Sequence, residues 1–281
     1  MKPIIAVIAP GSMGSAVGRR LVEHGAEVRT ALAGRSAATV ARAAACGMVA
    51  AEAPALARSA FILSIVPPGE AVGLARSLAP ALSLAERKPV YVDCNAVSPE
   101  TALRVAAIIG STGCRFVDAG IIGGPPLPGS AGPTFYASGP DAAEFAGLGD
   151  YGLEISLLDG PVGAASALKM SYAGITKGMT ALGTAMILAA TRAGVADALA
   201  AELAASQPGL LKIFQRSVPG MFPKAYRWVA EMEEIAAFSG DPATAEIYGG
   251  VAGLYRRITG DVAGANDDTA ALRDFFRRGN E

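Results

Sequence analysis

The sequence has little of what metal sites, disulfide frameworks and nucleic-acid-binding surfaces are built from. It contains one histidine and three cysteines, and only 17% of its 281 residues are charged. His24 falls at the end of a predicted helix, remote from any other candidate site, so a His-dependent triad or metal site is not expected. Cys46, Cys94 and Cys114 show no C-x-x-C spacing, which predicts no disulfide or metal cage and indicates a reducing compartment. A net charge of -1 gives no reason to expect a nucleic-acid partner.

Long hydrophobic runs are also missing. The apolar start of the chain stops at Pro10 and Gly11 and is followed by an amphipathic helix pattern, unlike a signal peptide. The uncharged stretch 178–191 is shorter than the ~20 residues that cross a bilayer. With 52% hydrophobic residues the chain is globular, and we expect it to be soluble and cytoplasmic, without a membrane partner.

Short apolar runs and helical patterns alternate through the first half of the chain. Predicted strands cover 3–9, 26–33, 60–66, 89–94 and 114–119, and predicted helices cover 12–24, 36–45, 69–79 and 99–109. Two closing strands follow a Gly/Pro-rich loop at 123–133. Because continuously apolar strands alternate with helices, this part is predicted to be an α/β Rossmann domain with a doubly wound, mostly parallel sheet.

The pattern becomes helical after Gly160. A long helix without proline is predicted over 164–192, and Gly174, Gly178 and Gly183 inside it indicate close contact with other helices. The sequence therefore predicts two domains, an α/β domain over residues 1–158 and an all-α domain over residues 159–281.

The loop "VIAPGSMGSAVG" at 7–18 joins the first predicted strand to the first predicted helix. Gly11 would let the backbone approach a pyrophosphate, and Gly14 would let the helix pack on the strand. The amides of Ser12, Met13 and Gly14 would bind phosphate at the helix N-terminus. Ala9 occupies the first glycine position of G-x-G-x-x-G, which is tolerable if its φ is negative. We expect a dinucleotide-binding loop; the alternative is a tight turn that binds nothing.

The end of the second predicted strand indicates which dinucleotide is bound. NAD-selective sites place an acidic residue there to hold the ribose 2′-hydroxyl. This chain has Arg35 and Ser36 instead, and a guanidinium with a hydroxyl suits a 2′-phosphate. The cofactor is therefore expected to be NADP(H) rather than NAD(H). Ser36 is also suited to cap the following helix, and both roles can coexist.

The motif Ala9-x-Gly11-x-Met13-Gly14 resembles the start of the β-hydroxyacid dehydrogenases, the group of 6-phosphogluconate and 3-hydroxyisobutyrate dehydrogenases. Segments resembling further motifs of this family follow in the same order: "SIVPPGEAV" (64–72), "VDCNAVSPET" (92–101), "VDAGIIGG" (117–124) and "GPVGAASALKMSYA" (160–173). The helical half, notably "YRWVAEMEEIA" (226–236), resembles the C-terminal domain of a phosphogluconate-dehydrogenase-like subgroup of poorly defined activity.

This resemblance implies roles for individual residues. Val66 and Pro67 would lie beside the nicotinamide, Asn95 near its ribose, and Lys169 would be the catalytic lysine. The substrate would be lined by Ile122, Gly123, Gly124 and Ala173. The resemblance also implies a homodimer formed through the helical domain.

Two departures from the family pattern concern the substrate. Ile122 stands where the family has Ser, and Ala173 where it has Asn, so groups that normally contact a substrate carboxylate or hydroxyl are missing. The pocket is expected to be less polar.

Three functions stay open. The first is an NADP(H)-dependent oxidoreductase that interconverts a β-hydroxyacid-like alcohol and a carbonyl compound, with Lys169 as general acid/base. The second is an imine reductase-like enzyme acting on a less polar small molecule. The third is a non-catalytic NADP-binding sensor or interaction protein.

Overall fold

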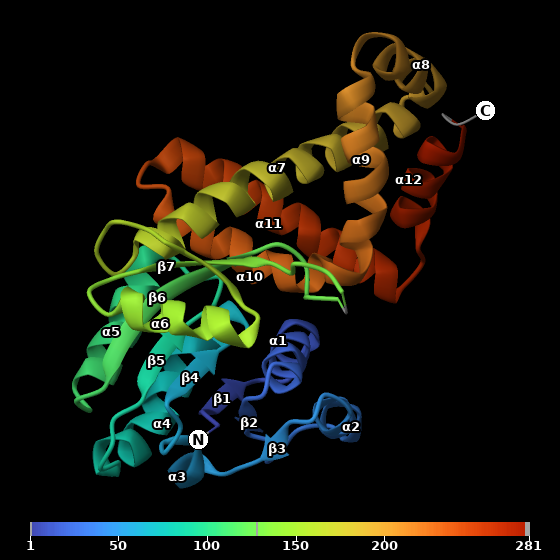
Figure 1. Cartoon of the computed structure of the whole chain (residues 1–281). Helices are drawn as coiled ribbons and strands as arrows, with labels where there is room; N and C mark the ends of the chain where they lie inside the picture. The colour runs from blue at the N-terminus through green and yellow to red at the C-terminus, as the bar shows by residue number, and fades with distance from the viewer. Residues whose placement is uncertain (1, 128, 279–281) are drawn as a thin grey trace. The chain divides into compact units, whose positions relative to one another are not determined.

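The computed structural model describes residues 2–127 and 129–278, and the chain divides into two compact units at Met170 and Ser171 (Figure 1). Helix α7 (Ala164–Arg192) begins in the first unit and continues in the second. The boundary lies further along the chain than the predicted 158/159, because the first turns of α7 pack with the α/β unit.

The first unit contains an eight-stranded sheet in the order β3-β2-β1-β4-β5-β6-β7-β8. Strands β1 to β6 pair in parallel, β7 is antiparallel to β6, and β8 is parallel to β7. This confirms the predicted Rossmann-type sheet. The strands are β1 Ile4–Ile8, β2 Glu27–Thr30, β3 Val49–Ala50, β4 Phe61–Ser64, β5 Val90–Asp93, β6 Arg115–Ile122, β7 Thr134–Ser138 and β8 Glu154–Leu157.

Helices cover both faces of this sheet, which is why its strands are apolar on both sides. Ile5 and Val7 of β1 join the core that α1, α2 and α6 form on one face. Ala6 and Ile8 join the core that α3, α4 and α5 form on the other. The helical segments are α1 Ser12–Glu23, α2 Ala37–Ala45, α3 Ala53–Leu56, η1 Pro68–Glu70, α4 Ala71–Leu84, α5 Pro99–Gly110, α6 Ala142–Ala146 and η2 Gly147–Tyr151.

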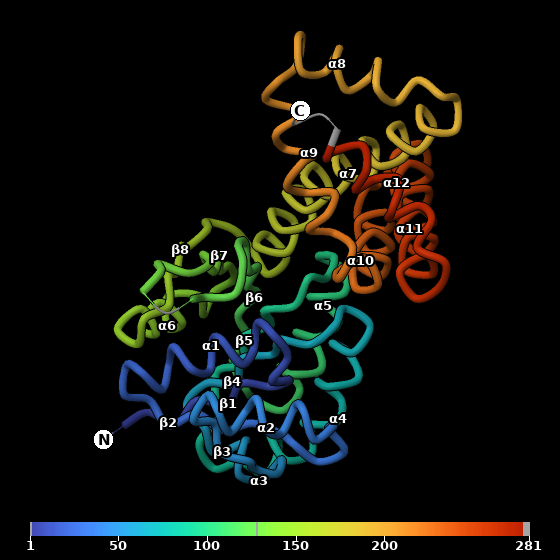
Figure 2. The backbone as a smooth tube through the Cα atoms, turned by 90° about the vertical axis from the view of Figure 1, so that its right-hand side faces the viewer, coloured from blue at the N-terminus to red at the C-terminus, as the bar shows by residue number. Residues whose placement is uncertain are grey.

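The second unit is helical throughout its described residues. After α7 it contains α8 Ala196–Ser206, α9 Pro208–Met221, η3 Phe222–Lys224, α10 Ala225–Phe238, α11 Pro242–Ala263 and α12 Asp267–Arg278. Helices α10 and α11 pack side by side, as the tube in Figure 2 shows.

The glycines inside α7 mark close contacts between helices, as the sequence predicts. A Cβ at Gly174 would lie 2.8 Å from the hydroxyl of Tyr248 on α11, and one at Gly183 would lie 2.6 Å from the ring of Phe214 on α9. A helical glycine costs about 1 kcal/mol relative to alanine, and here the close approach of aromatic rings requires it.

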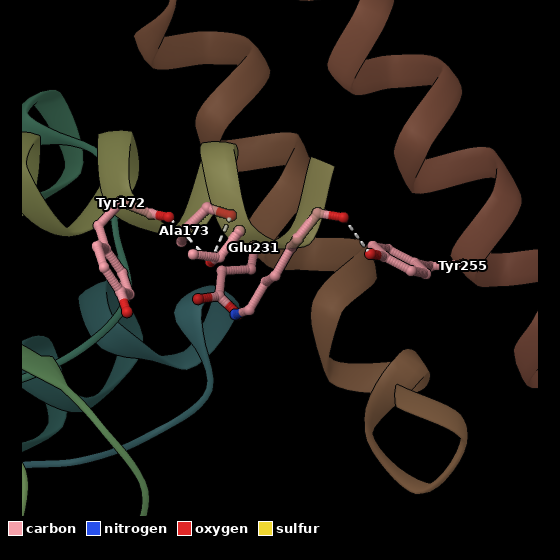
Figure 3. A network of polar contacts seen from close by, with 6 residues as sticks. Tyr172, Ala173, Glu231 and Tyr255 are labelled. Carbon is pink, nitrogen blue, oxygen red and sulfur yellow. Dashed lines mark hydrogen bonds and ion pairs between the residues drawn. The ribbon is translucent and has the colours of Figure 1, made fainter. Parts of the chain in front are cut away.

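A buried ion pair lies in the middle of α7. The Lys177 ammonium pairs with the Glu231 carboxylate of α10 and lies 4.9 Å from the ring centroid of Trp228. The Tyr255 hydroxyl of α11 donates a 2.5 Å hydrogen bond to the Lys177 carbonyl (Figure 3). Burial, followed by the charge of Glu231, raises the pKa of Tyr255, so this hydroxyl keeps its proton. By length and composition alone α7 would be long and apolar enough to cross a membrane, a test that core helices also pass.

The start of α7 is held by a carboxylate from the sheet. Asp118 of β6 is fully buried, and its Oδ2 accepts hydrogen bonds from the amides of Gly163 (2.9 Å) and Ser166 (3.0 Å) and from the Ser138 hydroxyl (3.0 Å). Its Oδ1 accepts a 2.6 Å bond from the Ser166 hydroxyl. Amides at a helix N-terminus lack partners within the helix and attract negative charge, so Asp118 ties the start of α7 to the sheet.

We expect Asp118→Ala to lower the free energy of unfolding by about 3 kcal/mol or more, because it leaves several buried donors unpaired at about 1–3 kcal/mol each. Urea unfolding followed by circular dichroism measures the change. The matched control is Asp150→Ala, an exposed aspartate of η2 that should stay within about 0.5 kcal/mol of the unmodified chain. Equal stability of the two variants would contradict the role assigned to Asp118.

Candidate functional site

The candidate site lies at the carboxyl edge of the parallel strands in the first unit. The loops that follow β1, β4, β5 and β6 all leave the sheet at this edge, since these strands run parallel. The chain reverses direction of winding at β1, which lies between β2 and β4. Ligands of open α/β sheets bind at such a switch point.

Two glycines of the loop after β1, Gly14 and Gly11, differ in whether packing leaves room for a side chain. A Cβ at Gly14 would lie 2.2 Å from the Ala9 carbonyl oxygen, so the turn itself requires this glycine. A Cβ at Gly11 would meet nothing within 4 Å. Gly11 is the N-cap of α1 and offers no side chain to the amides of Ser12, Met13 and Gly14, which have no partner within the helix. The space in front of these amides suits a pyrophosphate.

Ala9 contradicts one expectation. Its φ is +68°, whereas alanine was expected to be tolerable at this position if its φ were negative. The left-handed conformation costs a residue with a Cβ roughly 1–2 kcal/mol. The turn keeps it because the Ala9 carbonyl accepts a 2.8 Å hydrogen bond from the Gly11 amide and lies against Gly14. Alanine therefore adopts here the backbone conformation that glycine adopts without strain.

Arg42 contacts the loop after β1, and the sequence did not predict this contact. From α2, its guanidinium donates a 3.2 Å hydrogen bond to the Pro10 carbonyl, which also accepts a 2.8 Å bond from the Ser15 hydroxyl. These two bonds fix the loop from both sides. No local pattern identifies Arg42, because it differs from other helical arginines only in its distant partner.

Arg35 and Ser36 follow β2 at the same edge, and both are exposed. Ser36 caps α2 by accepting a hydrogen bond from the Thr39 amide at 3.3 Å, which confirms the capping interpretation. The Arg35 guanidinium has no hydrogen bond or ion pair with any described residue. It is therefore available for an anion.

Asn95, after β5, holds the loop that follows β4. Its Oδ1 accepts a 2.7 Å hydrogen bond from the Val66 amide, and its Nδ2 donates a 2.8 Å bond to the Ser64 hydroxyl. The residue is 2% exposed, so its side chain fixes Val66 and the exposed Pro67. Direct contact between Asn95 and a cofactor stays a prediction.

Asp93 lies directly beneath this loop and pairs in register with Asp118 on β6. Burial raises the pKa of the Asp93 carboxyl to about 7. A hydrogen bond from the backbone amide of Asn95 lowers this pKa, and the negative charge of Asp118 raises it further. Near neutral pH the proton on Asp93 therefore relieves the repulsion between two buried carboxylates. Burial also raises the pKa of the Cys94 thiol well above its ordinary value, which makes it a poor nucleophile.

The end of β6 lies against the helix turn that carries Lys169. A Cβ at Gly120 would lie 2.9 Å from both the Lys169 Cβ and the Ala165 carbonyl oxygen, so the missing side chain lets α7 approach the strand. Lys169 is half-buried, and its ammonium has no hydrogen bond or ion pair with any described residue. Lys169, the predicted catalytic lysine, thus lies at the same sheet edge as the loop that follows β1, which is the predicted phosphate-binding loop and is called the phosphate loop below.

The predicted substrate residues have different surroundings. Ile122 ends β6, half-buried and paired with Thr134 of β7. Gly123 has φ +128° and lies against Pro133, so the turn requires it, whereas Gly124 is exposed and a Cβ there would meet nothing within 4 Å. Ala173 belongs to the second unit and is buried there, at 1% exposure.

Arg20 of α1 anchors the loop that follows Gly124, a role that sequence reasoning missed. Its guanidinium donates hydrogen bonds to four carbonyl oxygens, those of Leu127, Ser130, Ala131 and Gly152, at 2.7–3.4 Å.

The geometry of Ala9 leads to a stability prediction. Ala9→Gly should raise the free energy of unfolding by about 1 kcal/mol, because relief of the positive φ outweighs the added freedom of the unfolded chain. Ala41→Gly, at an exposed position inside α2, should lower it by about 1 kcal/mol. Thermal unfolding of both variants measures the two changes, and destabilisation by Ala9→Gly would show that the loop is not strained.

Family models match both parts of the chain. Residues 4–147 match the NAD binding domain of 6-phosphogluconate dehydrogenase, and residues 190–258 match a domain of unknown function, DUF1932. None of the curated protein sequences compared with the chain matches it.

Solved structures cover nearly the whole chain. A conserved protein of unknown function that is structurally similar to 3-hydroxyacid dehydrogenases shares 27% identity over 98% of this chain and 99% of its own, with a TM-score of 0.70. The 3-hydroxyisobutyrate dehydrogenase of Mycobacterium tuberculosis, solved with L-serine, shares 21% over 98% and 99%, with a TM-score of 0.72. An imine reductase variant from Myxococcus stipitatus in complex with NAD+ shares 23% over 98% and 99%, with a TM-score of 0.59.

The matched NAD-binding domain covers β1 to α6 and so includes the loop that follows β1. The chain therefore belongs to the β-hydroxyacid dehydrogenase family and is an NAD(P)-dependent dehydrogenase or reductase.

Proposed function

We propose that the chain is an NADP(H)-dependent oxidoreductase that interconverts a β-hydroxyacid-like alcohol and its carbonyl compound, with Lys169 as the general acid/base. The observation that carries the proposal is the contact between Gly120 and the Lys169 turn. This contact holds Lys169, whose ammonium has no hydrogen bond or ion pair with any described residue, at the sheet edge where the phosphate loop lies.

The preference for NADP(H) rests on Arg35. A guanidinium without an ion-pair partner, next to the Ser36 hydroxyl, suits a 2′-phosphate through charge and bidentate hydrogen bonding. No carboxylate occurs between Glu27 and Glu52 to bind a ribose 2′-hydroxyl in its place.

The chain's own residues supply binding and proton transfer. The amides at the start of α1 bind the pyrophosphate, and Asn95 sets the position of Val66 and Pro67. A bound nicotinamide supplies or accepts the hydride. In the reducing direction the Lys169 ammonium donates a proton to the carbonyl oxygen, and in the oxidising direction the neutral amine accepts the hydroxyl proton.

An imine reductase-like activity is the second candidate. Ile122 offers no hydrogen bond at the end of β6, and a methyl group stands at Ala173, so both positions favour a less polar substrate. The similarity in fold to an imine reductase is compatible with this candidate. Retention of Lys169 favours the carbonyl substrate, because the imine reductases that resemble this family usually lack the lysine.

We also propose a homodimer formed through the helical unit, in the cytoplasm. Large apolar side chains three or four residues apart form one exposed face of α7, and a second copy would cover them. They are Tyr172, Ile175, Met179, Leu182 and Met186, which are 37–66% exposed. The three cysteines are free and buried, as a reducing compartment would allow.

The role of Lys169 is tested by oxidation of NADPH in the presence of ketones, semialdehydes and imines. Lys169→Met should lower kcat for the best carbonyl substrate about 10²–10⁴-fold, because general acid/base catalysis contributes that much, while the Kd for NADPH stays unchanged. Lys212→Met, at an exposed lysine of α9, is the control and should leave kcat unchanged. Full activity of Lys169→Met would remove the lysine from the mechanism, and tight NADPH binding without any turnover would favour a sensor.

The role of Arg35 is tested by binding alone. Arg35→Ala should raise the Kd for NADPH about 10–100-fold, since a charge-assisted pair contributes about 1.5–3 kcal/mol, and should leave the Kd for NADH unchanged. Arg76→Ala, at an exposed arginine of α4, is the matched control. Equal losses for both cofactors would show that Arg35 does not recognise the 2′-phosphate.

A further inference from the structure

The second unit has a cavity of its own. It has a volume of about 290 Å³ and lies where α9 turns through η3 into α10. Its lining residues are Ile213, Arg216, Ser217, Gly220, Lys224 and Trp228. All of them come from one continuous segment of the second unit, so this unit forms the cavity by itself.

The lining carries positive charge without a compensating carboxylate. Arg216 and Lys224 are both exposed, and neither side chain has a hydrogen bond or ion pair with any described residue. The carboxylate nearest in sequence, Glu231, is already paired with Lys177. The cavity is therefore suited to an anion, with the Arg216 fork able to bind two oxygens of a carboxylate or phosphate.

Ser217 provides a second, independent indication of a ligand. Its Oγ is buried and has no hydrogen-bond partner among the described residues. An unpaired buried hydroxyl costs about 1–3 kcal/mol, and rotation of this side chain towards the cavity would let a bound oxyanion accept its hydrogen bond. Gly220 leaves space beside it, since a Cβ there would meet nothing within 4 Å.

The remaining walls are apolar. Ile213 is 50% exposed, and the Trp228 ring is held in place by the Lys177 ammonium and by an edge-on contact with Tyr255, with ring centroids 5.3 Å apart. An immobilised aromatic ring facing an exposed aliphatic side chain suits a ligand with a hydrocarbon body.

We propose that this cavity binds a small organic anion, with its carboxylate or phosphate on Arg216, Lys224 and Ser217 and its apolar body against Trp228 and Ile213. The binding of this anion does not depend on the proposed function.

Trp228 is the only tryptophan of the chain, so its fluorescence reports on this cavity. We expect isovalerate, a branched carboxylate, to change the Trp228 emission saturably, and uncharged isoamyl alcohol or equimolar potassium chloride to leave it unchanged. Inorganic phosphate should compete with isovalerate. Lys169→Met should respond like the unmodified chain, which separates this test from that of the proposed function.

Substitutions of the lining sharpen the test. Arg216→Gln should raise the Kd for isovalerate about tenfold or more, because it removes a charge-assisted hydrogen bond, and Ser217→Ala should raise it by a smaller factor. Lys212→Gln, on the same helix but outside the cavity, is the matched control. Circular dichroism confirms that each variant is folded.

Three results would overturn the proposal. One is an emission change that does not saturate or that potassium chloride reproduces. Another is an isovalerate affinity that Arg216→Gln leaves unaltered. The third is an emission that responds to protein concentration instead of the ligand, which would assign the cavity to contact with a second copy of the chain.

Discussion

The hydrogen bonds of Asp118 hold the start of α7, and with it the turn that carries Lys169, on the sheet. A helix of 29 residues has to begin at a defined place on the sheet if its early residues are to reach the carboxyl edge. A buried carboxylate that accepts hydrogen bonds from Gly163 and Ser166 provides that place. Gly120 then allows contact with the Lys169 turn. The start of α7 and the position of Lys169 therefore depend on Asp118 together with the missing side chain at Gly120.

Packing explains some glycines near the candidate site and not others. Gly14 and Gly123 are required by neighbouring backbone atoms, whereas a Cβ at Gly11 or Gly124 would meet nothing within 4 Å. At these two positions packing does not require glycine. Ala9 shows the opposite: it carries a side chain although its positive φ is a backbone conformation that favours glycine.

Much of the fold was predictable from the sequence, and its tertiary contacts were not. The apolar runs identify β1, β4 and β5, and the absence of proline identifies α7. The two-residue strand β3 is too short and too exposed to leave a hydrophobic pattern. The motifs locate Lys169 and the phosphate loop. They cannot indicate that Arg42 fixes Pro10 or that Arg20 anchors a distant loop, because these contacts join residues 32 and more than 100 positions apart.

The anchoring by Arg20 also bears on how this enzyme can diversify. Every acceptor of its guanidinium is a main-chain carbonyl, so the attachment does not depend on which side chains the loop carries. An exposed side chain such as Leu127 can be exchanged while its carbonyl keeps the bond to Arg20, whereas Ser130, whose hydroxyl bonds to Leu127, and Gly132, which has a positive φ, are needed by the loop itself. Selection or a designed library could in this way vary the chemical surface that follows Gly124 without first rebuilding the scaffold that supports it.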